Sequence, residues 1–127
     1  MAIITSKKIK NFDDICKKIL QNKDIRYICI LNKMGNLILE KKQNRVKFLL
    51  PDKKSRGLYL KLKLESSLIK DFDDELGQLE FIVTYRKKIQ MISIPIYGNL
   101  VMISVKKNAN SRLIANTVLN LFRKIIN

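Results

Sequence analysis

The sequence predicts an α/β protein in which helices cover both faces of a central antiparallel five-stranded sheet. The first indication is an uncharged run of seventeen residues, Ile89 to Val105, which Lys88 and Lys106 bound. Its apolar residues are consecutive rather than alternating, as is typical of strands that are covered on both faces. The second indication is the order of the predicted elements, which is helix, two strands, helix, three strands and helix.

The uncharged run divides into two strands. A membrane-spanning helix needs about 20 apolar residues, whereas this run is shorter and contains Pro95, Gly98 and Asn99. The segment Tyr97-Gly98-Asn99 predicts a tight hairpin, because glycine supplies the positive φ that such a turn requires. We therefore expect two paired strands and no membrane span.

A helix followed by two strands is predicted before the middle of the chain. Asn11 is the expected cap of a helix over residues 12–21, whose apolar residues have helical spacing: Phe12, Ile15, Cys16, Ile19 and Leu20. Ile25 to Leu31 is β-branched and aromatic and predicts a central strand. Leu37 to Leu39 predicts a short strand at the sheet edge, because the charged residues after it oppose further pairing.

Residues 58–72 fit two interpretations. Leu58 to Leu64 alternate with period two, which favours a strand, but leucine, lysine and glutamate are good helix formers and no turn interrupts the segment. As a helix, the segment has one apolar face formed by Leu58, Leu62, Ile69 and Phe72, and a second formed by Leu60, Leu64 and Leu68. We expect the helix, with the strand as the alternative. Two apolar faces predict two contacts, one with the sheet and one with another copy of the chain.

The last third of the chain predicts a strand, the hairpin and a helix. Gly77 is the expected end of the middle helix. Residues 78–85 alternate as a strand does, with Leu79, Phe81, Val83 and Tyr85 on one side. The final helix is expected from Ser111 to about Ile126, because its apolar residues have helical spacing.

Length and composition predict one cytoplasmic domain over residues 1–127. Hydrophobic residues make up 46% and charged residues 29%, which is typical of a folded globular protein. Met1 to Thr5 is too short an apolar stretch for a signal peptide. Cys16 and Cys29 are expected to be buried free thiols, with a disulfide as the alternative.

The charge of the chain is large and segregated. The net charge is +15, and about half of the excess lies in one basic segment. This basic segment consists of Lys41, Lys42, Arg45, Lys47, Lys53, Lys54, Arg56, Lys61 and Lys63. It fits three interpretations, which are a phosphate-binding surface for nucleic acid, a surface for an acidic protein, and a solvated loop. Few aromatic residues accompany it, which disfavours single-strand stacking.

The side chains that catalysis usually requires are missing. The chain has no histidine, its two cysteines lack the spacing of a zinc site, and no glycine-rich nucleotide motif occurs. An acidic turn follows the middle helix, formed by Asp71, Asp73, Asp74 and Glu75. Carboxylates can bind Mg²⁺ or Ca²⁺, but the spacing of a calcium loop is absent, so a solvated helix end explains this turn better. We expect no enzyme, cofactor or metal.

The order of elements, the hairpin and the amphipathic end helix resemble the roadblock/LC7 domain, a profilin-like fold, and in particular small roadblock-like proteins of archaea. The residues that carry the resemblance are Cys16 to Leu20, Ile25 to Gly35, Phe72 to Gly77 and Arg86 to Ile96. The resemblance implies a homodimer whose middle helices pack antiparallel and whose edge strands join, through Leu60, Leu64, Leu68, Leu79, Phe81, Val83 and Tyr85. In that family such dimers are scaffolds that regulate small Ras-like GTPases without a catalytic site of their own.

Two functions follow as hypotheses. The first is a homodimeric, non-catalytic interaction module for a small GTPase or another acidic protein. The second is a nucleic-acid-associated protein that uses the basic segment.

Overall fold

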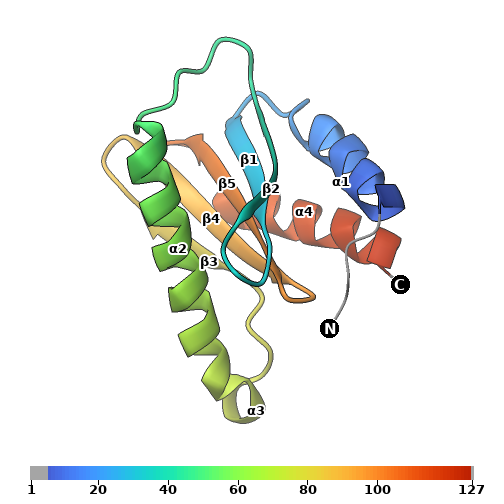
Figure 1. Cartoon of the computed structure of the whole chain (residues 1–127). Coiled ribbons are helices and arrows are strands. Elements are labelled where there is room, and N and C mark those ends of the chain that lie inside the picture. Colours follow the sequence, from blue (N-terminus) through green and yellow to red (C-terminus); the bar gives the residue numbers. More distant parts are fainter. Residues whose placement is uncertain (1–5, 127) are drawn as a thin grey trace.

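The computed structural model describes residues 6–126, so the expectation for Met1 to Thr5 lies outside the described residues. The elements are α1 (Ser6–Ile19), β1 (Ile25–Leu31), β2 (Leu37–Lys42), α2 (Asp52–Ile69), a 3₁₀ turn η1 (Lys70–Phe72), α3 (Asp73–Leu76), β3 (Ile82–Tyr85), β4 (Ile89–Ile96), β5 (Asn99–Lys106) and α4 (Ser111–Ile126) (Figure 1).

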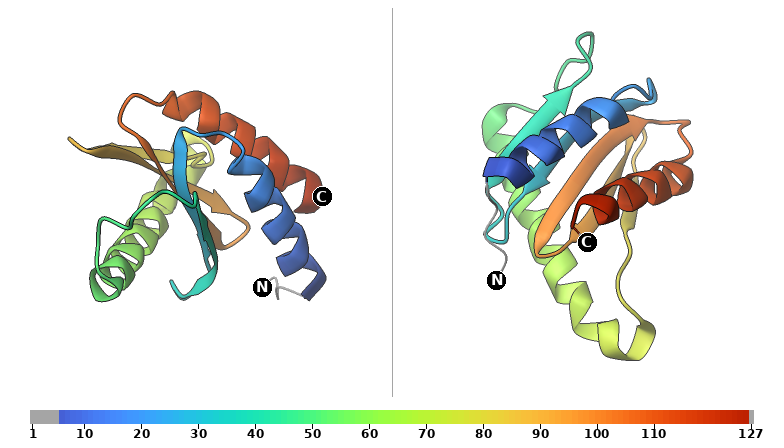
Figure 2. Two further views of the ribbon diagram at one scale, coloured as in Figure 1. Left: turned by 90° about the horizontal axis from the view of Figure 1, so that it is seen from above. Right: turned by 90° about the vertical axis from the view of Figure 1, so that its right-hand side faces the viewer.

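Helices cover both faces of one antiparallel five-stranded sheet, as the sequence predicts. The strand order is β2-β1-β5-β4-β3. α1 and α4 lie on one face, and α2 lies on the other (Figure 2). Each face has its own apolar core, because the central strands are buried on both sides: Ile28, Ile30, Ile92 and Ile103 pack toward α1 and α4, whereas Cys29, Leu31, Leu100 and Met102 pack toward α2.

The uncharged run forms the predicted hairpin of β4 and β5. Tyr97 and Gly98 have φ angles of 45° and 83°, so two residues with positive φ connect the strands, as a type I′ turn requires. Asn99 is the first residue of β5 rather than part of the turn. The hairpin provides two of the three central strands of the sheet.

The first helix begins earlier than predicted. α1 starts at Ser6, so Asn11 lies inside the helix and the prediction that it caps the helix is wrong. The predicted apolar face is confirmed for Phe12, Cys16 and Ile19, which are buried. Phe12 contacts Phe122 of α4 edge to face, with ring centroids 5.4 Å apart. Cys16 and Cys29 are free and buried, as predicted.

The middle segment is a helix, and the strand alternative is wrong. α2 starts at Asp52, six residues before the predicted element. It buries Tyr59, Leu62 and Ser66 against the sheet. Ile69 and Phe72 were predicted to share this buried face, but they are 40% and 60% exposed. The reason is that the end of α2 extends beyond the sheet toward α3 (Figure 1).

The strand predicted over residues 78–85 is shorter, because β3 contains only Ile82–Tyr85. Ile82 pairs with Ser93 of β4, so continued pairing would place Glu80 opposite Pro95. Proline has no backbone N–H to donate to a sheet. In addition, the N–H of Leu79 donates to Asp73 Oδ1 at 3.1 Å. Because of these two features, residues 78–81 do not continue the strand, and β3 begins at Ile82.

Candidate functional site

An exposed apolar surface runs along α2, and we call it the α2 outer face; it consists of Leu60, Leu64 and Leu68. These side chains are 54%, 60% and 58% exposed, respectively. They recur every four residues and therefore form one stripe along the helix. At about 100° per residue the stripe points directly away from the buried Leu62. The sequence prediction that α2 has an apolar side left over beyond its contact with the sheet is confirmed.

Some strand residues of the predicted interface also pack inside the subunit itself. Phe81 and Val83 are half-buried and pack against the core that α1 and α4 cover. Leu79 is also half-buried, whereas Tyr85 is 71% exposed. β3 is the last strand of the sheet, so within residues 6–126 its outer edge pairs with no other strand. Tyr85 and the backbone of β3 are therefore the accessible parts of this edge.

The residues of the basic segment lie on β2, on the loop after it and on α2. Three of its nine side chains bond to other groups within residues 6–126. Lys41 Nζ lies 2.8 Å from Asp13 Oδ1, Lys42 Nζ donates to the carbonyl oxygen of Val46, and Lys63 Nζ donates to that of Gly98. The other six are Arg45, Lys47, Lys53, Lys54, Arg56 and Lys61, and all six side chains are exposed.

The ion pair of Asp13 links α1 to β2. The hydrogen bond from Lys41 lowers the pKa of the Asp13 carboxyl below its ordinary value, and Lys17, whose Nζ is 3.2 Å away, lowers it further. In Lys63, burial lowers the pKa of the ammonium group, and the nearby charges of Lys70 and Lys33 lower it further. The lowered pKa disfavours the charged form of Lys63.

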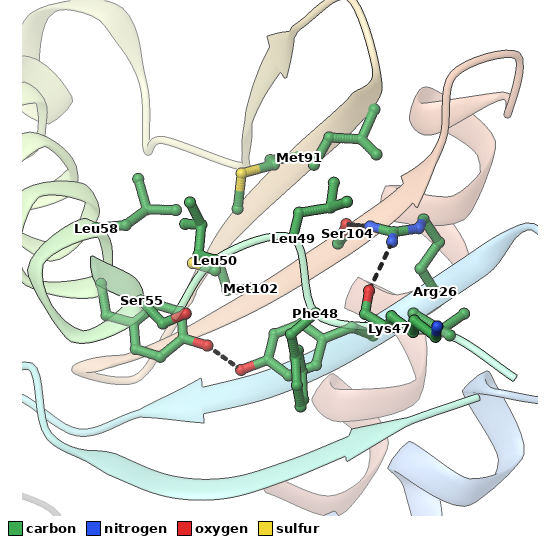
Figure 3. A pocket seen from close by; sticks show the side chains of 14 residues that line it. Arg26, Lys47, Phe48, Leu49, Leu50, Ser55, Leu58, Met91, Met102 and Ser104 are labelled. Carbon is green, nitrogen blue, oxygen red and sulfur yellow. Dashed lines mark hydrogen bonds between the residues drawn. The ribbon is translucent and has the colours of Figure 1, made fainter. Parts of the chain in front are cut away.

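A small cavity lies beneath the loop before α2 (Figure 3). Its volume is about 70 Å³, and side chains such as Leu58, Met91 and Met102 line it. Arg26 lies at one end and donates to Ser104 Oγ at 3.1 Å and to the carbonyl oxygen of Lys47 at 3.2 Å. Ligand pockets usually measure about 300 Å³ or more, so this cavity is too small for a nucleotide or a flavin.

A buried pair of tyrosine hydroxyl groups belongs to residues that also line this cavity. The hydroxyl groups of Tyr27 and Tyr59 bond to each other, and Tyr27 also donates to Glu40 Oε2 at 3.3 Å. Burial raises the pKa of both phenols. Sequence reasoning missed this cavity, and its one available signal was Arg26, the single charge in an otherwise apolar strand.

The two cysteines are not activated as nucleophiles. Burial raises the pKa of the Cys16 and Cys29 thiols to about 12, so neither is a thiolate at neutral pH. In the part of the chain that the structure describes, no three His, Cys, Asp or Glu side chains gather as a metal site would require. Among the helices of residues 6–126, none combines the length and hydrophobicity needed to cross a membrane.

The chain belongs to a family of unknown function, DUF6659, whose model matches residues 4–126. No curated protein matches its sequence.

Solved structures show that the fold is the roadblock/LC7 fold. The gliding protein MglB from Thermus thermophilus matches with a TM-score of 0.77 at 10% identity, covering 97% of this chain and 93% of that chain. A roadblock/LC7 domain from Streptomyces avermitilis matches with a TM-score of 0.68 at 10% identity, covering 89% and 92%. LokiProfilin1, in complex with rabbit actin, matches with a TM-score of 0.56 at 16% identity, covering 95% and 96%. The predicted roadblock and profilin-like fold is confirmed.

Proposed function

We propose that residues 1–127 act as one non-catalytic interaction domain of the cytoplasm. The domain pairs with a second copy through the α2 outer face and the edge of β3. The dimer then docks a small Ras-like GTPase or another acidic protein. The observation that carries this proposal is the stripe of three leucines on α2, each more than half exposed.

The leucine stripe supports pairing because exposed apolar area is costly in water. Fully burying a leucine side chain stabilises by about 1.5–3 kcal/mol. A two-fold pair of α2 helices covers six such side chains at once. The unpaired outer edge of β3 supports the same assembly, because backbone groups at a sheet edge are ready to pair with another strand.

The docking role rests on the fold and on the charge. The roadblock resemblance implies a scaffold for small GTPases. The net charge of +15 favours association with an acidic surface, because opposite potentials steer the encounter of two proteins. The free, buried state of both cysteines supports a reducing compartment.

Light scattering after size-exclusion chromatography tests the pairing. Leu64→Glu places a charge in the middle of the α2 outer face and is expected to give a monomer. Leu113→Glu is the matched control, because Leu113 is 62% exposed but lies on α4, across the sheet. If both variants and the unaltered chain have the mass of one subunit at micromolar concentration, the proposed pairing is wrong.

Binding to purified Ras-like GTPases tests the docking role. Each GTPase is loaded with GDP or with a non-hydrolysable GTP analogue, and binding is followed by calorimetry. We expect the unaltered chain to bind one nucleotide state more tightly and Leu64→Glu to bind more weakly than Leu113→Glu. Equal binding by all three chains would show that GTPase binding does not depend on pairing of the two copies. That result would contradict this part of the proposal.

The second candidate function is association with nucleic acid. The observation in its favour is that Lys53, Lys54 and Arg56 are exposed side by side at the start of α2, with Arg45 and Lys47 on the preceding loop. Phosphate contacts weaken steeply as salt rises, so retention of duplex DNA or RNA is measured near 50 mM and 200 mM salt. Absence of retention at the lower concentration would exclude this function.

A further inference from the structure

The loop between β2 and α2 exposes three apolar side chains in a row. Phe48, Leu49 and Leu50 are 46%, 52% and 37% exposed, respectively, and we call them the apolar triplet. All three also line the cavity beneath the loop, so part of each side chain faces inward and part faces solvent (Figure 3). A run of three exposed apolar residues is disfavoured on a protein surface unless it has a function.

The loop that carries the apolar triplet is held against the sheet. The carbonyl oxygen of Lys47 accepts a hydrogen bond from Arg26 at 3.2 Å. The ring of Phe48 packs edge to face on Tyr27, with ring centroids 5.3 Å apart. Ile89, the first residue of β4, lines the same cavity as the triplet. The triplet therefore lies in a defined place, near the end of the sheet at which β4 starts.

Basic side chains from three separate segments gather at this end of the sheet. β4 starts here and β5 ends here, because Ile89 pairs with Lys106. The loop after β2 rises above this end (Figure 1), and the left view of Figure 2 looks onto it. Residues 43–56, 86–88 and 106–110 contain ten basic residues and one acidic residue, Asp52, so they carry +9. We call the ten exposed basic side chains the basic end: Arg45, Lys47, Lys53, Lys54, Arg56, Arg86, Lys87, Lys88, Lys106 and Lys107.

The acidic turn lies at the far end of α2. It follows the last residue of the helix, and a helix of 18 residues is about 27 Å long. A negatively charged surface therefore attracts the basic end and repels the acidic turn. Such a surface orients the molecule with the apolar triplet toward it.

An anionic lipid bilayer matches both features of this end. Lysine and arginine side chains are attracted to anionic headgroups, and leucine and phenylalanine side chains enter the boundary between headgroups and acyl chains. Phosphate contacts to duplex nucleic acid need the basic side chains but not the leucines. Stacking on single-stranded bases needs aromatic side chains, and the triplet contains one. The combination of charge and leucines therefore favours the bilayer.

We propose that the basic end and the apolar triplet bind the surface of an anionic phospholipid bilayer, with the triplet among the headgroups. The binding is peripheral and needs no membrane-spanning helix. The proposal assigns a use to the exposed part of the basic segment and adds residues 86–88 and 106–107 to it. The triplet and the α2 outer face share no residue, so this binding does not depend on the pairing of two copies.

Co-sedimentation of the full chain with vesicles tests the proposal. One set of vesicles contains phosphatidylcholine alone, and the other contains phosphatidylcholine and phosphatidylglycerol in equal amounts. We expect binding to the mixed vesicles only. Raising the salt from 50 mM to 500 mM is expected to weaken this binding at least about tenfold, because salt screens the attraction between the basic end and the headgroups.

A leucine variant tests the apolar contribution. It carries Leu49→Ser and Leu50→Ser and keeps Phe48, which packs on Tyr27. The matched control carries Met34→Ser and Leu76→Ser, because these side chains are 74% and 82% exposed but lie on the β1–β2 turn and on α3, away from the basic end. We expect the leucine variant to bind the mixed vesicles at least about tenfold more weakly than the control.

A lysine variant tests whether the three segments act as one surface. It carries Lys87→Gln and Lys88→Gln, which lie outside the basic segment. The matched control carries Arg123→Gln and Lys124→Gln, which remove the same charge at the end of α4. We expect the lysine variant to bind at least about tenfold more weakly than this control, because each basic residue near an anionic surface contributes to binding.

A fluorescence measurement tests the position of the apolar triplet. The chain contains no tryptophan, so Leu49→Trp introduces a single reporter. Tryptophan is at home in the headgroup region, and its emission is expected to shift to shorter wavelength when mixed vesicles are added. An unchanged emission spectrum under conditions in which the protein sediments with the vesicles would show that the triplet stays in water.

Three results would overturn the proposal. The first is no binding to the mixed vesicles at 50 mM salt. The second is a leucine variant that binds like its control, since charge alone would then explain the binding. The third comes from duplex DNA supplied at the same phosphate concentration. If the unaltered chain prefers the DNA to the mixed vesicles and the leucine variant keeps that preference, the basic end is a nucleic-acid surface instead.

Discussion

Replacing Leu64 by alanine is the perturbation whose effect on pairing follows most directly from the structure. Fully burying a leucine side chain is worth about 1.5–3 kcal/mol, and Leu64 is 60% exposed in the single subunit. Covering the exposed part is therefore worth about 1–2 kcal/mol in each subunit. Leu64 is in the middle of the α2 outer face and is replaced in both subunits, so the dimer loses about 2–4 kcal/mol.

That loss corresponds to a dissociation constant higher by about thirty-fold to several hundred-fold, because each 1.4 kcal/mol is about a factor of ten. Alanine is the best helix former, so α2 itself is expected to remain folded, which circular dichroism checks. Sedimentation velocity across a concentration series measures the constant. Leu113→Ala is the matched control, since Leu113 is 62% exposed on the opposite side of the sheet. Dissociation constants that agree within threefold for the two variants would show that Leu64 is not buried between the two subunits.

Three further predictions concern the stability of the single subunit, measured by urea unfolding in the monomeric Leu64→Glu background. Gly57→Ala is expected to raise the free energy of unfolding by about 0.5–1 kcal/mol, because alanine is the better helix former and its Cβ meets open space; a loss would contradict this. Asp13→Asn is expected to lower stability at pH 7 by up to about 1 kcal/mol. The ion pair lowers the Asp13 pKa from 3.8, so its contribution is present above that pH and disappears as the pH falls below it; a difference that persists in acid would exclude the ion pair as its cause. Gln90→Ala is expected to cost about 2–3 kcal/mol, because Gln90 Nε2 donates to the carbonyl oxygens of Lys107 and Ala109 at 2.7 and 2.9 Å. The exposed Gln78→Ala is its control, and equal costs for the two variants would contradict that assignment.

The sequence predicts the central sheet well because burial on both faces leaves a strong pattern. The bounds of β1 are those predicted, since the run Ile25 to Leu31 is apolar on consecutive positions and a turn follows it. The hairpin was predictable for the same reason, because Gly98 marks the turn between two uncharged strands.

Elements at the edge of the fold were harder to predict because their patterns depend on partners far away in the chain. The shortening of β3 depends on Pro95, which lies on a different strand from the residues that it keeps unpaired. In α2 the buried face was partly misassigned, because leucines occur on both sides and only the position of the sheet shows that Tyr59 is covered and Phe72 is not.

The candidate site was predictable only in part. The leucines of the α2 outer face follow from helical spacing, but the cavity beneath the loop does not, because residues from β1, α2, β4 and β5 meet there only after folding.

In the proposed dimer, two copies of the chain cover each other's α2 helices. The mass of the unaltered protein in solution, measured by sedimentation equilibrium at micromolar concentration and low salt, shows whether this dimer forms. We expect twice the subunit mass of 14.8 kDa. A single species of 14.8 kDa at all concentrations would contradict it.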